Sequence, residues 1–302
     1  MIFENAPEFP APGQVTTWIG LIPGFRFKAL CRYFPAVKKY DLNFSTTAFL
    51  SLLLLFFGAF LFYPASFMLK GAFFAGGKFT LRYFSLLLES PLQRQSIFNS
   101  FAIALLTTGL TTVLALPLAH WMTRFDFRGK GSIRLLMLAP IVLPGMVIAL
   151  FLSRVFFFLG LAGTFSGLVL GHTLLGLPYM ARLLSTSFEA IPPEVSDAAS
   201  NLGASELRKM REVYLPLAAA GIFAGVIFTF VASLEEFALT YVIGTPNFQT
   251  IPTILFSFLG QRFVRPVGAA VSLILLVPNV VLLFIADRAV KEDVMTRGYG
   301  KL

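Results

Sequence analysis

Pro193-Glu-Val-Ser-Asp-Ala-Ala-Ser-Asn-Leu-Gly203-Ala-Ser-Glu-Leu-Arg-Lys-Met-Arg-Glu-Val-Tyr-Leu-Pro216 is a polar stretch between two apolar runs, and it decides the fold. Pro193 suits the first turn of a helix, and Glu194 beside it favours the positive helix N-terminus. Gly203 can adopt the left-handed conformation that ends a helix. The pattern therefore predicts a short helix that stops at Gly203.

A second helix is predicted after this corner. Ser205 can cap it, it would begin near Glu206, and Pro216 opens the apolar run that follows. The first helix carries small apolar residues at the spacing i, i+3, i+4 and i+7, which places them on one face. They are Val195, Ala198, Ala199 and Leu202. A connecting loop has no need of such a face, so we expect a partner to cover it.

The composition around this stretch excludes a soluble protein. Of the 302 residues, 57% are hydrophobic, only 13% are charged and 35 are Phe, and the mean hydropathy is +0.79. Soluble domains carry about 25% charged residues, so the composition predicts an integral membrane protein. One cysteine excludes an internal disulfide framework and a multi-cysteine metal site. We expect neither a metal nor a cofactor.

Six uncharged runs are long enough to cross the hydrocarbon core as helices, which needs about 20 residues. They are Leu42–Leu69, Gln95–Thr123, Leu135–Ser153, Val155–Ala181, Val213–Leu234 and Pro266–Ala286. A seventh run, Phe237–Gln261, contains helix-breaking and polar residues. We interpret it as an extracytoplasmic loop, re-entrant and packed on protein, so the predicted class is an all-α membrane protein with six spans in residues 46–286.

Charge predicts the orientation. With both termini in the cytoplasm, 17 of the 24 Lys and Arg residues fall inside, as the positive-inside rule requires. The basic excess is therefore an orientation signal and gives no reason to expect nucleic acid. Residues 1–45 read as a basic cytoplasmic tail, either a helix on the membrane surface or loosely ordered, and residues 287–302 as a second cytoplasmic tail. We expect a multi-pass membrane protein with both termini in the cytoplasm.

The polar stretch also resembles a family motif. Asp197-Ala198-Ala199, three residues, Gly203, nine residues and Val213-Tyr-Leu215-Pro216 closely match the EAA loop of binding-protein-dependent ABC importer permeases. That pattern is EAA, three residues, Gly, nine residues and I-x-L-P; here Asp replaces Glu and Val replaces Ile. The resemblance implies the type I importer permease fold and a coupling loop, residues 188–214, that docks on an ATPase. The residues it implicates are Glu194, Asp197, Ala198, Ala199, Leu202, Gly203, Leu215 and Pro216.

Further segments look like the spermidine/putrescine branch, especially its second permease. They are 79–84, 124–130, 138–145, 233–246 and 250–257. This resemblance implies import of a polyamine, with ferric iron, an opine or amino-acid derivative, or a phosphonate as alternatives. It also implies the partners: two ABC ATPase subunits, a second permease in a heterodimer, a periplasmic or lipoprotein substrate-binding protein, and the bilayer.

No ATP site is expected in this chain. The nearest approach to a phosphate loop, Gly76-Gly77-Lys78-Phe79, has Ala at position 72 where the first glycine belongs, and Phe where Ser or Thr would hold magnesium. We therefore expect the chain to be a transport subunit that is not itself an enzyme. A stand-alone secondary transporter is the competing class, but it predicts inverted repeats and buried charge series that the sequence lacks.

Two glutamates mark a candidate outer gate. Glu235 lies about 28 Å along a helix from Pro216, so this pair should sit towards the outer side of the bilayer. A glutamate near the apolar zone usually faces a cavity or a partner. Two roles are open: contact with a cationic substrate, or a gate hydrogen bond. The candidate gate residues are Ser233, Glu235, Glu236 and Tyr241.

The two histidines are given structural roles. His172, within the fourth run, is expected to pack or hydrogen-bond across helices rather than relay protons. His120, beside Trp121 at the inner end of the second run, is expected to anchor at the membrane interface.

Overall fold

The computed structural model describes residues 44–262 and 264–299. The chain divides into residues 1–63 and 64–302, which are described separately. The predicted basic tail, residues 1–45, lies outside the described residues except for its last two, which begin helix α2 (Phe44–Phe73). From Thr46 to Tyr63 almost every side chain of α2 is exposed, as expected for an apolar helix surrounded by lipid.

The second part begins at Pro64, within α2, and is mostly helical. Its elements are β1 (Phe74–Ala75), β2 (Lys78–Phe79), α3 (Arg82–Glu89), α4 (Pro91–Arg124), α5 (Lys130–Val142), α6 (Gly145–Phe158), α7 (Phe165–Glu189), α8 (Pro193–Asn201), α9 (Glu206–Lys209), η2 (Met210–Tyr214), α10 (Leu215–Leu217), α11 (Ala219–Glu235), η3 (Thr240–Gly244), α12 (Ile251–Phe256), η4 (Ser257–Gln261) and α13 (Arg265–Tyr299). The two strands form an antiparallel hairpin, and the three η segments are π-helical turns.

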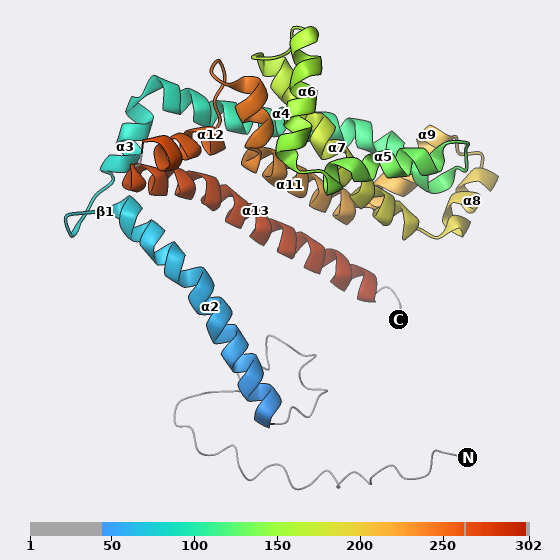
Figure 1. Cartoon of the computed structure of the whole chain (residues 1–302). Helices are drawn as coiled ribbons and strands as arrows, with labels where there is room; N and C mark the ends of the chain where they lie inside the picture. The colour runs from blue at the N-terminus through green and yellow to red at the C-terminus, as the bar shows by residue number, and fades with distance from the viewer. Residues whose placement is uncertain (1–43, 263, 300–302) are drawn as a thin grey trace, which may run out of the picture. The chain divides into compact units, whose positions relative to one another are not determined.

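Helices α4, α7 and α11 form the centre of this part, and α13 packs against α11 (Figure 1). The buried face of α4 is made of small side chains, many of them polar. Small residues let helix backbones approach closely, and hydroxyls can bond to carbonyls of their own helix, as Thr108 does to Ala104 at 2.7 Å. Figure 1 shows α8 and α9 at one end of this bundle and α12 at the other.

The six predicted spans are present as four straight helices and two bent pairs. The third prediction, one helix from Leu135 to Ser153, is wrong in shape because α5 and α6 meet at 113°. Leu143 is extended (φ −79°, ψ 139°) and Pro144 follows it. Proline disfavours the helical conformation in the residue before it, which breaks the span there.

The fourth and fifth spans also differ from their predicted limits. Residues 155–158 belong to α6, and the fourth span, α7, begins only at Phe165. In the fifth, α9–α10 meets α11 at 78°. The break falls at Ala218 (φ −97°, ψ 7°), two residues after Pro216.

The segment Phe237–Gln261 is more helical than the predicted loop. It folds into η3, α12 and η4, and α12 packs against α4 and α13. Ile251 and Ile254 of α12 belong to a buried apolar cluster with Leu87 of α3 and Val271 of α13. The segment is therefore packed on protein, as predicted, without forming a seventh straight span.

Candidate functional site

The predicted helical corner is present at the end of the bundle formed by α8 and α9. Helix α8 begins at Pro193, and Gly203 follows it with φ +81°. The N–H groups of Gly203 and Ala204 donate to the carbonyls of Ser200 and Ala199 at 2.9 and 3.0 Å, which closes the helix end. Ser205 then caps α9, accepting from the Arg208 N–H at 3.4 Å. We refer to residues 188–214, the predicted coupling loop, as the coupling segment.

Side-chain bonds hold α8 to the segment that follows it. The Tyr214 hydroxyl donates to Ser196 Oγ at 3.0 Å. The Lys209 ammonium donates to Ser200 Oγ at 3.0 Å and pairs with Glu206 at 2.5 Å. Tyr214 and Lys209 are both buried. These bonds join two successive turns of α8 to α9 and η2, so the corner can move as one body.

The coupling segment is anchored to α4 through Arg124. Its Nη2 donates to the carbonyls of Phe188 and Ile191, both at 2.7 Å. The guanidinium also lies over the ring of Tyr214, 5.1 Å from its centroid. Arg124 therefore satisfies carbonyls at the end of α7 and contacts the start of the fifth span. A shift of the coupling segment would therefore be transmitted to α4, α7 and the start of the fifth span.

His120 departs from its predicted role at the membrane interface. It is buried, 4.7 Å from the Tyr214 ring between centroids, and its Nε2 lies 3.6 Å from a Glu206 carboxylate oxygen. The prediction was wrong because Tyr214, 94 positions later, folds back onto α4 and covers the imidazole.

The outward face of α8 is exposed. Leu202 is 87% exposed, Leu207 of α9 is 80% exposed and Val195 is 39% exposed. Asp197 and Ala198 are exposed too, whereas Leu215 is half-buried. No other residue of the described part of the chain covers this apolar face. Exposed clusters of large apolar side chains often mark a binding surface for a partner.

The candidate gate residues lie at the far end of α11. His172 of α7 bridges two of its neighbours: Nδ1 is 2.8 Å from Ser233 Oγ, and Nε2 is 3.0 Å from Thr240 Oγ1. Nε2 also lies 3.8 Å from Glu236 Oε2. The Glu236 carboxylate accepts from the N–H groups of Leu239 and Thr240 at 2.9 and 3.1 Å. It thus caps the helical turn that follows the break after α11.

The two glutamates, treated as a pair in the sequence, have different surroundings. Glu236 lines a cavity of about 360 Å³ between α5, α6, α7 and α11, together with His172 and Ser233. Glu235 is exposed and accepts a hydrogen bond from Asn279 of α13. Tyr241 packs against Phe237 and Phe256 and is outside that lining. Only Ser233 and Glu236 of the four gate candidates reach the cavity.

Sequence reasoning missed the partners of these residues. The hydrogen bonds predicted for His172 are present, but Thr240 was not named as one of its partners, and Arg124 was not named as the anchor of the coupling segment. An arginine at the end of an apolar run, 64 residues from its acceptor, gives no local signal of that contact. For His172 the signal was its place in an apolar run, where a polar group needs partners.

Comparisons with known proteins give consistent results. The family model described as "binding-protein-dependent transport system inner membrane component" matches residues 112–291. The spermidine/putrescine transport system permease protein PotC of Shigella flexneri is 27% identical over 222 residues, covering 74% of this chain and 83% of the relative. A putative ABC transporter permease protein of Streptomyces antibioticus is 33% identical over 215 residues, covering 69% and 91%.

The fold matches solved structures as well. A chain of a bacterial ABC transporter involved in the import of the acidic polysaccharide alginate superposes with a TM-score of 0.65 at 14% identity. The match covers 89% of this chain and 98% of that one. The predicted type I importer permease fold is therefore confirmed. The residues that reach the cavity and the exposed face of α8 both lie within the matched family region.

Proposed function

The chain belongs to the family of binding-protein-dependent transport system inner membrane components, and on that premise we propose that it imports a polyamine. It is a permease of an ABC importer, a multi-pass component that carries solute across the inner membrane. The observation that supports a cationic substrate is the position of Glu236. Its carboxylate lines the cavity enclosed by α5, α6, α7 and α11.

The cavity lining suits a slender organic cation. Tyr179 and Phe228 lie on its wall, with ring centroids 5.7 Å apart. Aromatic faces attract ammonium groups, and a carboxylate in a partly apolar site attracts them more strongly. A polyamine could place one ammonium near Glu236 and its methylene chain along the rings. The similarity to PotC across most of the chain supports the same substrate.

We propose that ATP is hydrolysed by two partner subunits. The support is the exposed apolar face of α8, including Leu202 and Val195. The permease would pair with a second, different permease, and an extracytoplasmic binding protein would deliver the solute. Both termini would lie in the cytoplasm, which places the coupling segment on the ATPase side.

The mechanism follows from how the coupling segment is held. Closure of the ATPases would displace α8, and the Tyr214–Ser196 bond would carry that displacement to η2 and the fifth span. Arg124 would carry it to α4 and α7. At the far end of α7, His172 connects to Ser233 and Thr240, beside the cavity. Movement at one end of α7 and α11 would thus alter access to Glu236 at the other.

The two glutamates provide a matched test of the substrate. Spermidine uptake is measured with the assembled transporter carrying Glu236→Gln or Glu235→Gln. Glutamine keeps an oxygen to accept the N–H bonds at Glu236 but removes the charge. We expect KM to rise about tenfold or more for Glu236→Gln, because a charged hydrogen bond contributes about 1.5–3 kcal/mol. The Glu235 variant should retain its KM.

Unchanged KM in the Glu236 variant, with normal assembly, would rule out a ligand role. A fall in kcat alone would instead assign Glu236 to the gate. If the partner binding protein binds ferric iron, an opine or a phosphonate but no polyamine, that ligand would replace the polyamine as the proposed substrate.

A further inference from the structure

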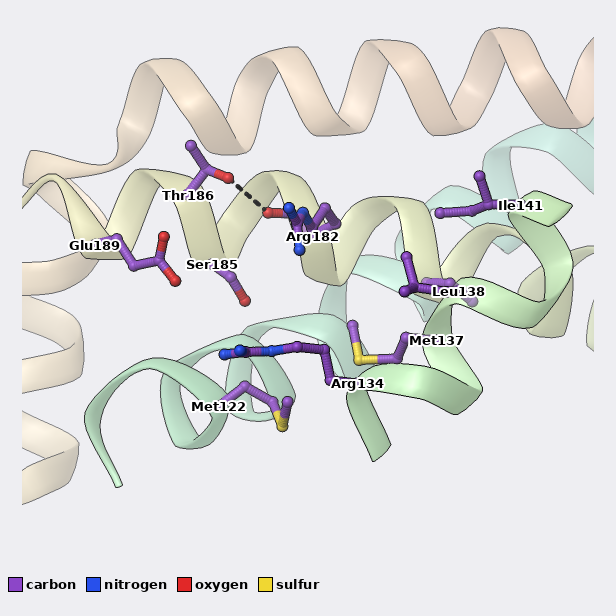
Figure 2. Close-up of a pocket in the computed structure, with 10 residues that line it drawn as sticks. Met122, Arg134, Met137, Leu138, Ile141, Arg182, Ser185, Thr186 and Glu189 are labelled. Atoms are coloured by element: carbon purple, nitrogen blue, oxygen red, sulfur yellow. Dashed lines mark hydrogen bonds between the residues drawn. The ribbon is translucent and has the colours of Figure 1, made fainter. Parts of the chain in front are cut away.

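A second cavity, of about 270 Å³, lies between α4, α5 and α7 near the coupling segment. Arg134 of α5 and Arg182 of α7 line it from two helices, and Ser185 and Glu189 lie on the α7 side. Figure 2 shows Arg134 extending beneath α7, on the side where Ser185 and Glu189 lie. Its lining includes neither Glu236 nor the residues that tie α8 to η2, although Ile141 lines both cavities.

Both arginine side chains are exposed, and neither makes a hydrogen bond or an ion pair with a side chain of residues 46–262 and 264–288. The Thr186 hydroxyl donates to the backbone carbonyl of Arg182 at 3.1 Å and does not reach its guanidinium (Figure 2). Arg182 lies seven residues before the end of α7, about 10 Å along the helix axis. The uncharged run predicted as the fourth span ends at Ala181, so the Arg182 guanidinium is expected at the cytoplasmic edge of the bilayer, where anionic lipid headgroups lie.

Apart from Thr186, the rest of the lining is apolar and consists of Met122, Met137, Leu138, Ile141 and Pro178. The cavity is therefore amphipathic, with two guanidinium groups, one carboxylate and two hydroxyls close to an apolar surface. A free inorganic anion would gain nothing from that wall, whereas a phospholipid presents a phosphate directly joined to apolar chains. The charged lining sums to +1, which one phosphodiester balances.

We propose that this cavity binds the phosphodiester headgroup of an anionic phospholipid from the leaflet that faces the coupling segment. Arg134 and Arg182 each donate to phosphate oxygens, since the guanidinium fork matches phosphate geometry. Ser185 can donate a third hydrogen bond, and the upper part of an acyl chain lies along Met137 and Ile141. Because the site bridges α5 and α7, its occupancy would hold these two helices together.

The test measures lipid retention by the full-length protein in detergent. Phosphatidylglycerol is titrated and bound lipid is counted by native mass spectrometry. We expect the Arg134→Gln/Arg182→Gln double variant to bind this lipid at least about tenfold more weakly, because two charged hydrogen-bond donors are lost. Arg154→Gln, a change outside the cavity lining, is the matched control and should bind like the unchanged protein. Arg134→Lys/Arg182→Lys should restore part of the affinity.

Two arms separate the sources of the phosphate. Phosphatidylcholine with the same acyl chains should compete weakly, and inorganic phosphate should not displace the lipid. Equal retention in the double glutamine variant, or full displacement by inorganic phosphate or by spermidine, would overturn the proposal. A photoreactive phosphatidylglycerol on the unchanged protein gives a readout independent of variant folding. It should label peptides containing Met137 or Met122, and labelling confined to other helices would contradict the site.

Discussion

The Tyr214 hydroxyl donates to Ser196 Oγ at 3.0 Å and so joins the start of the fifth span to the middle of α8. Tyr214 is 1% exposed, and its ring contacts His120, Phe188 and the Arg124 guanidinium. One side chain therefore connects the exposed coupling segment to α4 and α7. In the proposed mechanism this is the contact through which movement of α8 reaches the bundle.

Tyr214→Phe tests that connection while retaining the ring contacts. A neutral hydrogen bond contributes about 1 kcal/mol, so we expect uptake per ATP hydrolysed to fall a few-fold while the ATPase still co-purifies. Ser196→Ala should produce the same defect, because it removes the other half of the bond. Tyr83→Phe is the matched control, because Tyr83 of α3 packs against the apolar cluster that contains Leu87. Normal coupling in both Tyr214→Phe and Ser196→Ala would show that the bond transmits nothing.

Gly203 tests the corner itself. Its φ of +81° is in the left-handed region, and no atom lies within 4 Å of a Cβ built there. A substitution therefore meets backbone strain and no steric clash. Gly203→Val should cost about 1–2 kcal/mol and lower uptake, whereas Gly203→Asn should be tolerated because asparagine adopts this conformation more readily.

The control for that pair is Gly131→Val. Gly131 lies within α5 without a positive φ and also has open space around its Cβ. Uptake by the three variants is compared at equal expression. If Gly203→Val and Gly203→Asn behave alike, the left-handed corner is not what the segment requires.

His172 should contribute to stability through its two bonds. Hydrogen bonds between membrane helices contribute about 0.6 kcal/mol on average and up to about 1.7. His172→Ala leaves the hydroxyls of Ser233 and Thr240 without this partner and opens a void, so we expect a loss of about 1–3 kcal/mol in the free energy of unfolding. Thermal unfolding in detergent measures it.

A double-mutant cycle with Ser233→Ala isolates the bond. The combined variant should lose less than the sum of the two single changes, because both remove the same contact. Strict additivity would mean that the 2.8 Å contact between His172 and Ser233 contributes nothing measurable.

The sequence predicts the existence of the spans better than their shape. Burial in lipid depends on composition, so uncharged runs such as Gln95–Thr123 are visible as spans without knowledge of the fold. Backbone direction is not visible in this way. The break at Leu143–Pro144 had a local signal, since proline restricts the residue before it. The break at Ala218 had only Pro216, which in other contexts simply begins a helix.

The candidate site shows the same difference between local features, which the sequence predicts, and long-range contacts, which it does not. The corner at Gly203 depends on neighbouring residues, and its backbone conformation was predicted correctly. The separation of Glu235 from Glu236 depends on Asn279 and on the turn at Leu239 and Thr240, contacts that no spacing reveals. The burial of His120 likewise depends on Tyr214. In each of these cases the surroundings of the residue depend on long-range packing, which local sequence patterns do not reveal.

The exposed face of α8 is the surface that we propose binds an ATPase subunit. Ala198 lies on that face, and Ala198→Arg would place a long charged side chain where the partner packs. Ala75→Arg, at the exposed β1 strand, is the matched control. The direct measurement is co-purification of the ATPase with each full-length variant. We expect Ala198→Arg to lose the ATPase and Ala75→Arg to retain it. An Ala198→Arg variant that keeps its ATPase and supports normal uptake would rule out ATPase binding at this face.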